Sequence, residues 1–242
     1  MKKTILKRLF LWSPSADTAA ATLSVVLLTI LAYMGLVIFE GTWLSFFIFV
    51  LAGTVGVCVI FPLYWMVVRR KKDLDTLGIT TKHWLASLLV SVLLAGFSLW
   101  DYHRSFGISV ATVPSLIVGV YALWEIVFIC GWIQLRFEEA FGIIPGIILA
   151  SLCGSLYHIG YGSCDFSILV VLFIVGVFPA AIFRSTKNIL ILWPFFMPIA
   201  SLRAFKMGDF SPDWTTAGCS VASLVLMLIS IFLFYRIQNR NG

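Results

Sequence analysis

The chain has 242 residues, of which 61% are hydrophobic and 12% are charged, and its formal net charge is +6. This composition is too apolar for an ordinary soluble domain of that length and indicates a protein whose solvent is the lipid bilayer. The cations mostly flank apolar runs, where membrane topology requires them, so the positive charge does not indicate a nucleic-acid partner and we expect none.

Apolar runs along the chain predict about eight transmembrane helices. A bilayer core about 30 Å thick takes roughly 20 apolar residues per helix, so this length holds at most about eight spans with short loops. The runs are long rather than alternating, which favours helices over barrel strands. In chain order, the expected spans lie near residues 18–39, 43–68, 83–100, 108–136, 144–162, 166–183, 188–204 and 215–235. We therefore expect an all-α polytopic membrane bundle that forms a single transmembrane domain over residues 1–242.

Loop charges predict the orientation of this bundle. The segment Ser13 to Asp17 interrupts the amino-terminal region and no small-residue cleavage site follows, so we expect the first span to be retained. With the amino terminus in the cytoplasm, the inside loops carry most cations, namely Arg69 to Lys72, Arg136, Arg184, Lys187, Arg236 and Arg240. The positive-inside rule then places both termini in the cytoplasm, for a multi-pass protein of the plasma or inner membrane.

The interiors of the expected spans contain one acid, Glu125, and one histidine, His158. A charged side chain near the bilayer centre costs roughly 2.5–3.5 kcal/mol on insertion scales, which favours a partner or a function for each. In a helical hairpin that turns near residue 141, both lie about 24 Å from the turn at a rise of about 1.5 Å per residue. They are therefore predicted to meet, either as structural partners or as a general acid and base.

Small and polar residues form a stripe on the same predicted helix as His158. Ser151, Gly154, Ser155 and His158 recur at helical spacing, and such a stripe lets another helix approach closely. The end of the preceding helix, Gln134 to Phe141, is amphipathic and is expected to project from the bilayer.

The sequence around these two residues resembles a known family. The stretch EIVFICGWIQLRFEEAFG from Glu125 to Gly142, followed by LCGSLYH from Leu152 to His158, is similar to the core of the CAAX-protease and bacteriocin-processing family of intramembrane peptidases. That family typically has an E-E-x-x-x-R-G motif and an F-x-x-x-H motif on the next helix. Glu125 matches the first glutamate, Gly131 the glycine and His158 the histidine. The resemblance places a peptidase-like core at about residues 108–204.

Other motif positions depart from the family pattern. Ile126 replaces the second glutamate, Cys130 the arginine and Gly154 the phenylalanine. The family's later histidine, with an asparagine four positions on, has no counterpart in Thr186 to Leu202, although Trp193-Pro194 is similar. These later residues are thought to stabilise an oxyanion, a contribution of about 10²–10³ in rate per donor. The remaining candidates for this role are Asn188, Tyr157, Tyr161 and Ser201.

The resemblance implies an intramembrane endopeptidase in which Glu125 activates water and His158 is its acid/base partner, acting on a membrane-associated peptide or protein. The alternative is a catalytically impaired pseudopeptidase that acts as a binding, immunity or scaffold protein. A proton-relaying transporter would predict internal repeats, and the sequence has none. No cofactor is expected. A zinc ion is the less favoured alternative, because Glu125 and His158, even with Cys130 or Cys153, fall short of a recognisable zinc-binding set.

Overall fold

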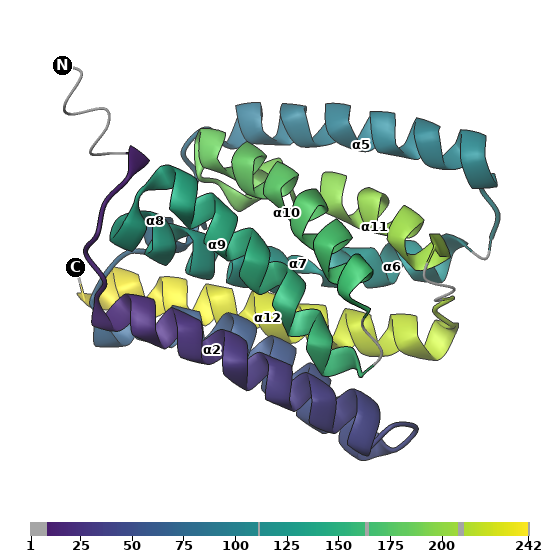
Figure 1. Ribbon diagram of the computed structural model, residues 1–242, viewed down its shortest axis with the longest axis horizontal. Helices are drawn as coiled ribbons and strands as arrows, with labels where there is room; N and C mark the ends of the chain where they lie inside the picture. The colour runs from purple at the N-terminus through teal and green to yellow at the C-terminus, as the bar shows by residue number, and fades with distance from the viewer. Residues whose placement is uncertain (1–8, 111, 163–164, 208–210, 242) are drawn as a thin grey trace.

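The computed structural model describes residues 9–110, 112–162, 165–207 and 211–241, and every regular element in this part of the chain is a helix. The helices run side by side in one bundle (Figure 1). Seven of those described are long and apolar enough to cross a membrane. The predicted all-α polytopic fold, which makes the chain an integral multi-pass membrane protein, is confirmed.

The first two spans form a hairpin. The first, Ala16–Ile38, consists of α2 (Ala16–Tyr33) and η1 (Met34–Ile38). It begins after Ser15, whose hydroxyl accepts hydrogen bonds from the backbone N–H groups of Asp17 and Thr18 and so caps the helix. The second span, Trp43–Arg69, comprises α3 (Trp43–Ser45), η2 (Phe46–Ile60), α4 (Phe61–Leu63) and η3 (Tyr64–Arg69). A short turn, η4 (Leu74–Leu77), then leads to α5 (Trp84–Phe106).

The fourth span, Thr112–Phe141, is the most buried of the seven and lies at the centre of the bundle. It contains α6 (Thr112–Tyr121), α7 (Leu123–Glu125), η5 (Ile126–Gln134) and α8 (Leu135–Phe141). The chain turns at Gly142, one residue from the predicted position, into α9 (Ile143–Leu156) and η6 (Tyr157–Tyr161). Gly142 has a φ of +92° and a Cβ there would lie 2.5 Å from the carbonyl oxygen of Leu9, so the turn requires glycine.

The predicted span 188–204 is not one continuous helix. After α10 (Phe166–Thr186) come a single turn, η7 (Ile189–Ile191), and the short helix α11 (Phe196–Met207). Proline lacks a backbone N–H, so Pro194 separates the two pieces. The segment still joins the two ends of the bundle: Asn188 donates to the carbonyl of Lys82 beside the start of α5, and Arg203 pairs with Asp101 near the end of α5. The last span lies in α12 (Trp214–Asn241).

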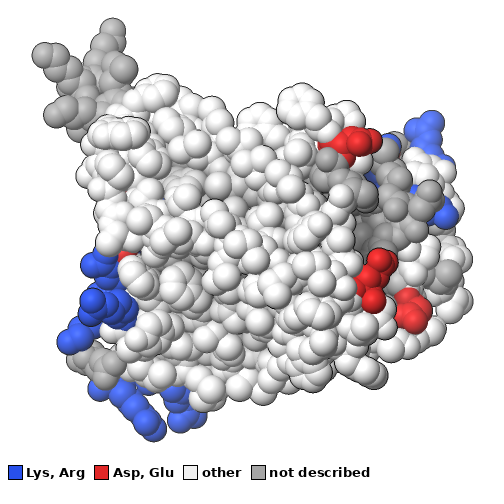
Figure 2. All heavy atoms as spheres, turned by 60° about the horizontal axis from the view of Figure 1, so that its bottom comes forward, with Lys and Arg blue, Asp and Glu red and all other residues white. Residues whose placement is uncertain are grey.

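At one end of the bundle, Lys and Arg side chains gather and hydrogen bonds join neighbouring segments of the chain. Near the amino terminus the backbone N–H of Leu11 donates to the carbonyl of Phe141, and the backbone N–H of Leu74 donates to Gln238 on α12. Figure 2 shows the largest group of Lys and Arg side chains at this end, whereas the largest groups of Asp and Glu lie at the opposite end. The loops predicted to share one side of the membrane therefore lie together at this end.

Candidate functional site

Glu125 lies in the central span, one turn after an irregular residue. Ala122 has a ψ of +10°, which interrupts the helix between α6 and α7. The side chain of Glu125 is partly buried, while its neighbours Trp124 and Ile126 are almost fully buried. The carboxylate is thus held inside the bundle, because the residues before and after it in the helix are buried.

The direct partner of Glu125 is Tyr157. The Tyr157 hydroxyl donates a hydrogen bond of 2.7 Å to Glu125 Oε1. Tyr157 is only 2% exposed, and its ring packs edge-on against Trp124 at a centroid distance of 5.8 Å. A buried tyrosine from the next helix therefore fixes the orientation of the carboxylate.

His158 belongs to the same cluster but does not contact Glu125 through a hydrogen bond or ion pair in the described part of the chain. Its ring stacks on Tyr157 at 4.2 Å between centroids, and its Nδ1 lies 2.9 Å from the carbonyl oxygen of Gly154. A carbonyl only accepts, so this bond requires the proton on Nδ1 and leaves Nε2 as the acceptor nitrogen. The two predicted residues are brought together, with Tyr157 between them.

Glu125 and His158 lie at matching distances from the turn, as predicted. The residue whose side chain bonds Glu125 is Tyr157, one position before the predicted His158. The chain tightens from α-helix to 3₁₀ winding at Tyr157, so the α-helical spacing used to assign faces ends just before His158. The distance of a residue from the turn follows from counting residues, but the direction in which its side chain points depends on rotation about the helix axis. The nearby sequence signal was the pair Tyr157 and Tyr161, spaced at one helical turn.

Further hydroxyl groups surround this cluster. The ring of Tyr161 lies 5.0 Å from the His158 ring, and its side chain is 37% exposed. One turn before Glu125, the hydroxyl of Tyr121 forms a 2.5 Å hydrogen bond with Thr54 of the second span. Three spans therefore contribute polar side chains to this part of the bundle.

The predicted small-residue stripe contacts two neighbouring helices rather than one. The Ser155 hydroxyl donates to the carbonyl of Leu169 on α10 at 2.6 Å, and Ser151 lies against Gly176 on the same helix. Gly154 instead faces Ile129 of the central span. Close packing at the stripe thus holds α9 between α10 and the helix that carries Glu125.

The positions that depart from the family motif lie in apolar packing. Ile126 and Cys130 are buried in one hydrophobic cluster with Ile191, Leu192 and Phe196, which come from the segment corresponding to the family's third motif. Gly131, which matches the motif, is buried where its backbone meets the carbonyl of Leu77. The face of the central span that packs against the 188–204 segment is consequently apolar at Ile126 and Cys130.

Of the four candidate oxyanion donors, only the two tyrosines contact this cluster. The side chain of Asn188 is bound to Thr80, Lys82 and Leu190, where it fixes the loop before α5. The Ser201 hydroxyl donates to the carbonyl of Pro198 at 2.8 Å. Both groups therefore serve local backbone structure.

No family model, curated protein or solved structure matches this chain significantly. The family resemblance rests on Glu125, Gly131, His158 and the sequence between them.

A second polar cluster, at the cation-rich end, was not predicted. Glu138 is buried, and it accepts a hydrogen bond of 2.9 Å from Gln134 and forms an ion pair of 3.0 Å with Arg184. Arg136, only 1% exposed, donates to the carbonyl of Thr76 at 2.8 Å. Loop residues from Asp75 to Leu77 and from Arg184 to Lys187 cover residues 134–141, so this segment packs against the rest of the bundle; that it projects from the bilayer stays a prediction.

The chemistry available at the cluster around Glu125 is proton transfer. A carboxylate has two acceptor oxygens, and Tyr157 bonds one of them. Among the described residues, no group of three or more His, Cys, Asp and Glu side chains is placed to hold a metal ion. The described residues of this cluster offer the Glu125 carboxylate, the His158 imidazole and the phenols of Tyr157 and Tyr161.

Proposed function

We propose that this chain is an intramembrane peptidase of the CAAX-protease and bacteriocin-processing type, in which Glu125 activates water for attack on a peptide bond of a membrane-associated substrate. The observation that supports this most strongly is the oriented carboxylate, held inside the bundle by the Tyr157 hydroxyl with the His158 ring stacked on the same tyrosine. An ionisable pair at this depth is costly unless it has a task.

Each group has a role in this proposal. Glu125 accepts a proton from water as the water oxygen bonds to the carbonyl carbon, and Tyr157 holds the carboxylate in position. His158, with its Nδ1 engaged by Gly154, accepts this proton from Glu125 at Nε2 and passes it to the leaving amine as the carbon–nitrogen bond breaks. General acid–base catalysis of this kind contributes about 10²–10⁴ in rate. The partly exposed Tyr161 supplies a hydroxyl for the oxyanion.

The alternative proposal is a pseudopeptidase that binds a peptide or a membrane partner without cleaving it. The observation that favours it is the apolar cluster around Ile126 and Cys130, which occupies the place of the family's second glutamate and arginine. Loss of those charges reduces the means of stabilising a charged transition state.

Cleavage assays with purified protein in detergent distinguish the two proposals. A library of prenylated carboxy-terminal peptides and small secreted peptides is incubated with the wild type, Glu125→Gln, His158→Ala and the control Glu40→Gln, and products are identified by mass spectrometry. Glu40 is an acid in the loop after the first span, so its change leaves the cluster intact. Product from the wild type and Glu40→Gln alone supports the peptidase. Equal product from all four proteins contradicts it, and peptide binding without product supports the pseudopeptidase.

A further inference from the structure

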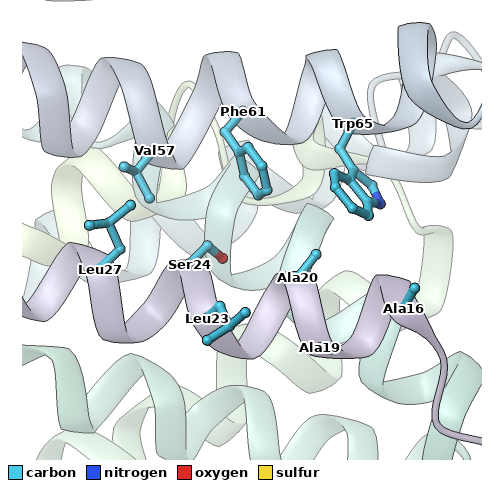
Figure 3. Close-up of a pocket in the computed structure, with 9 residues that line it drawn as sticks. All are labelled: Ala16, Ala19, Ala20, Leu23, Ser24, Leu27, Val57, Phe61 and Trp65. Atoms are coloured by element: carbon cyan, nitrogen blue, oxygen red, sulfur yellow. The ribbon is translucent and has the colours of Figure 1, made fainter.

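An apolar groove of about 380 Å³ lies between the first two spans (Figure 3). Small side chains of α2, among them Ala16, Ala19 and Ala20, form one wall, and the rings of Phe61 and Trp65 form the other. Leu23, at the rim, is 67% exposed. The groove therefore opens on the outer surface of the bundle.

The groove presents no free polar group to an occupant. The Ser24 hydroxyl, which lines it, donates to the carbonyl of Ala21 and accepts from Trp132. The indole N–H of Trp65 donates to Asp17 at 2.8 Å. A peptide in extended form would leave its backbone N–H and C=O groups unpaired here, whereas a hydrocarbon chain would not.

The dimensions suit a single hydrocarbon chain. The lining runs from Ala16 to Leu27 along α2, a length of about 16 Å at about 1.5 Å per residue. At about 380 Å³ the groove is too small for a helix of that length, which with its side chains is about 10 Å wide, but it has room for an extended hydrocarbon chain.

Cations stand at one end of this groove. The guanidinium of Arg70 lies 5.8 Å from the centroid of the Trp65 ring that lines the groove, and it forms a 2.5 Å ion pair with Asp17. Asp17, the acid at this end, is thereby neutralised. Arg69, Lys71 and Lys72 are exposed beside it, and within the described part of the chain none of the three has an ion-pair partner.

We propose that this groove is a binding site for an anionic phospholipid, with one acyl chain between α2 and the second span and the phosphate held by Arg69, Lys71 and Lys72. The charge of the headgroup complements the exposed cations, and basic clusters next to a span select anionic lipids in this way. The site is independent of the peptidase proposal, because its residues lie outside the cluster around Glu125.

Lipid titration in nonionic detergent, followed by native mass spectrometry, tests the proposal on the full chain. The probes are dioleoylphosphatidylglycerol and dioleoylphosphatidylcholine. Each cation next to a membrane surface contributes about fivefold in affinity for anionic lipid, so the triple variant R69Q/K71Q/K72Q is expected to bind phosphatidylglycerol about a hundredfold more weakly at low salt. The matched control is R236Q/R240Q, which removes cations from the end of α12 and should change binding far less.

A second pair of variants tests the groove itself. Ala19→Phe fills it, whereas Val26→Phe adds the same ring to an exposed position of α2 that does not line it. We expect Ala19→Phe to lose bound lipid of both kinds and Val26→Phe to retain it. Equal affinity of the wild type for both lipids, or unchanged lipid binding by Ala19→Phe, overturns the proposal. A third result would also overturn it: light scattering shows that the wild type is a dimer, and Ala19→Phe dissociates this dimer without loss of lipid. The groove would then hold a second copy of the chain.

Discussion

The Tyr157 hydroxyl bonds Glu125 Oε1 at 2.7 Å and links the central span to the helix that follows it. This hydrogen bond places an acid, a phenol and the stacked His158 ring in one cluster. The hydrogen bond should stabilise the fold whether or not the chain is a peptidase, because a carboxylate buried inside the bundle needs a hydrogen-bond donor.

Tyr157→Phe removes that donor and keeps the ring. Hydrogen bonds to charged groups contribute about 1.5–3 kcal/mol, so we expect this variant to lower the free energy of unfolding in detergent by about that amount. The control is Tyr64→Phe, at a residue that is 48% exposed, where the same change should have little effect. Equal unfolding midpoints for both variants in a denaturant titration would show that the Tyr157 hydroxyl does not hold Glu125.

The sequence contained enough information to place Glu125 and His158 at the same depth. Hydropathy located the two spans and a turn near residue 141, and the constant rise of a helix then gave the distance of each residue from that turn. The contact itself was not predictable in this way, because one residue changes the facing direction by about 100°. The 3₁₀ winding that begins at Tyr157 altered that direction further.

Two other features depended on tertiary partners that hydropathy does not report. The run 188–204 is as apolar as a span, but Pro194 and the interactions of Asn188 with the loop before α5 divide it. The segment 134–141 is amphipathic, yet Arg136 and Glu138 are buried because backbone and side chains from distant loops bind them. Such partners lie far apart in the sequence and meet only in the folded bundle.

Gly131 allows close backbone contact between the central span and the loop before α5. A Cβ at this position would overlap the carbonyl oxygen of Leu77. Gly131→Ala is therefore expected to lower the free energy of unfolding by about 1–3 kcal/mol, the usual cost of overpacking. Gly96→Ala is the control, since a Cβ there meets nothing within 4 Å and should stabilise helix α5 by about 0.5–1 kcal/mol. Thermal unfolding in detergent should shift in opposite directions, and a shift of the same sign would contradict the close contact.

Arg136 joins the central span to the loop that contains Thr76. One of its terminal nitrogens donates to the Thr76 carbonyl at 2.8 Å and the other lies 3.1 Å from Glu139. Lysine carries a single ammonium and does not reproduce this planar, two-sided contact. We expect Arg136→Lys to lower the free energy of unfolding by about 1–3 kcal/mol and to speed proteolysis of the loop before α5. Arg240→Lys, at an exposed arginine of α12, is the control, and an equal loss in both variants would show that the burial of Arg136 is unimportant.

Asp213 caps helix α12 and makes the stability of this helix sensitive to acid. Its carboxylate accepts hydrogen bonds from the Thr216 hydroxyl at 2.6 Å and from the Thr216 backbone N–H at 2.7 Å, and these bonds lower the pKa of Asp213. The contribution to stability is therefore complete above the unfolded pKa of about 3.9 and is lost as the pH falls through the lower folded value. Asp213→Asn keeps a capping side chain that does not titrate. Unfolding temperatures measured from pH 7 to pH 2 should show an advantage of the wild type over Asp213→Asn that begins to shrink below about pH 4 and is lost as the pH falls through the lower folded value. A constant difference between the two proteins across this range would mean that the Asp213 carboxylate does not cap α12 through its charged form.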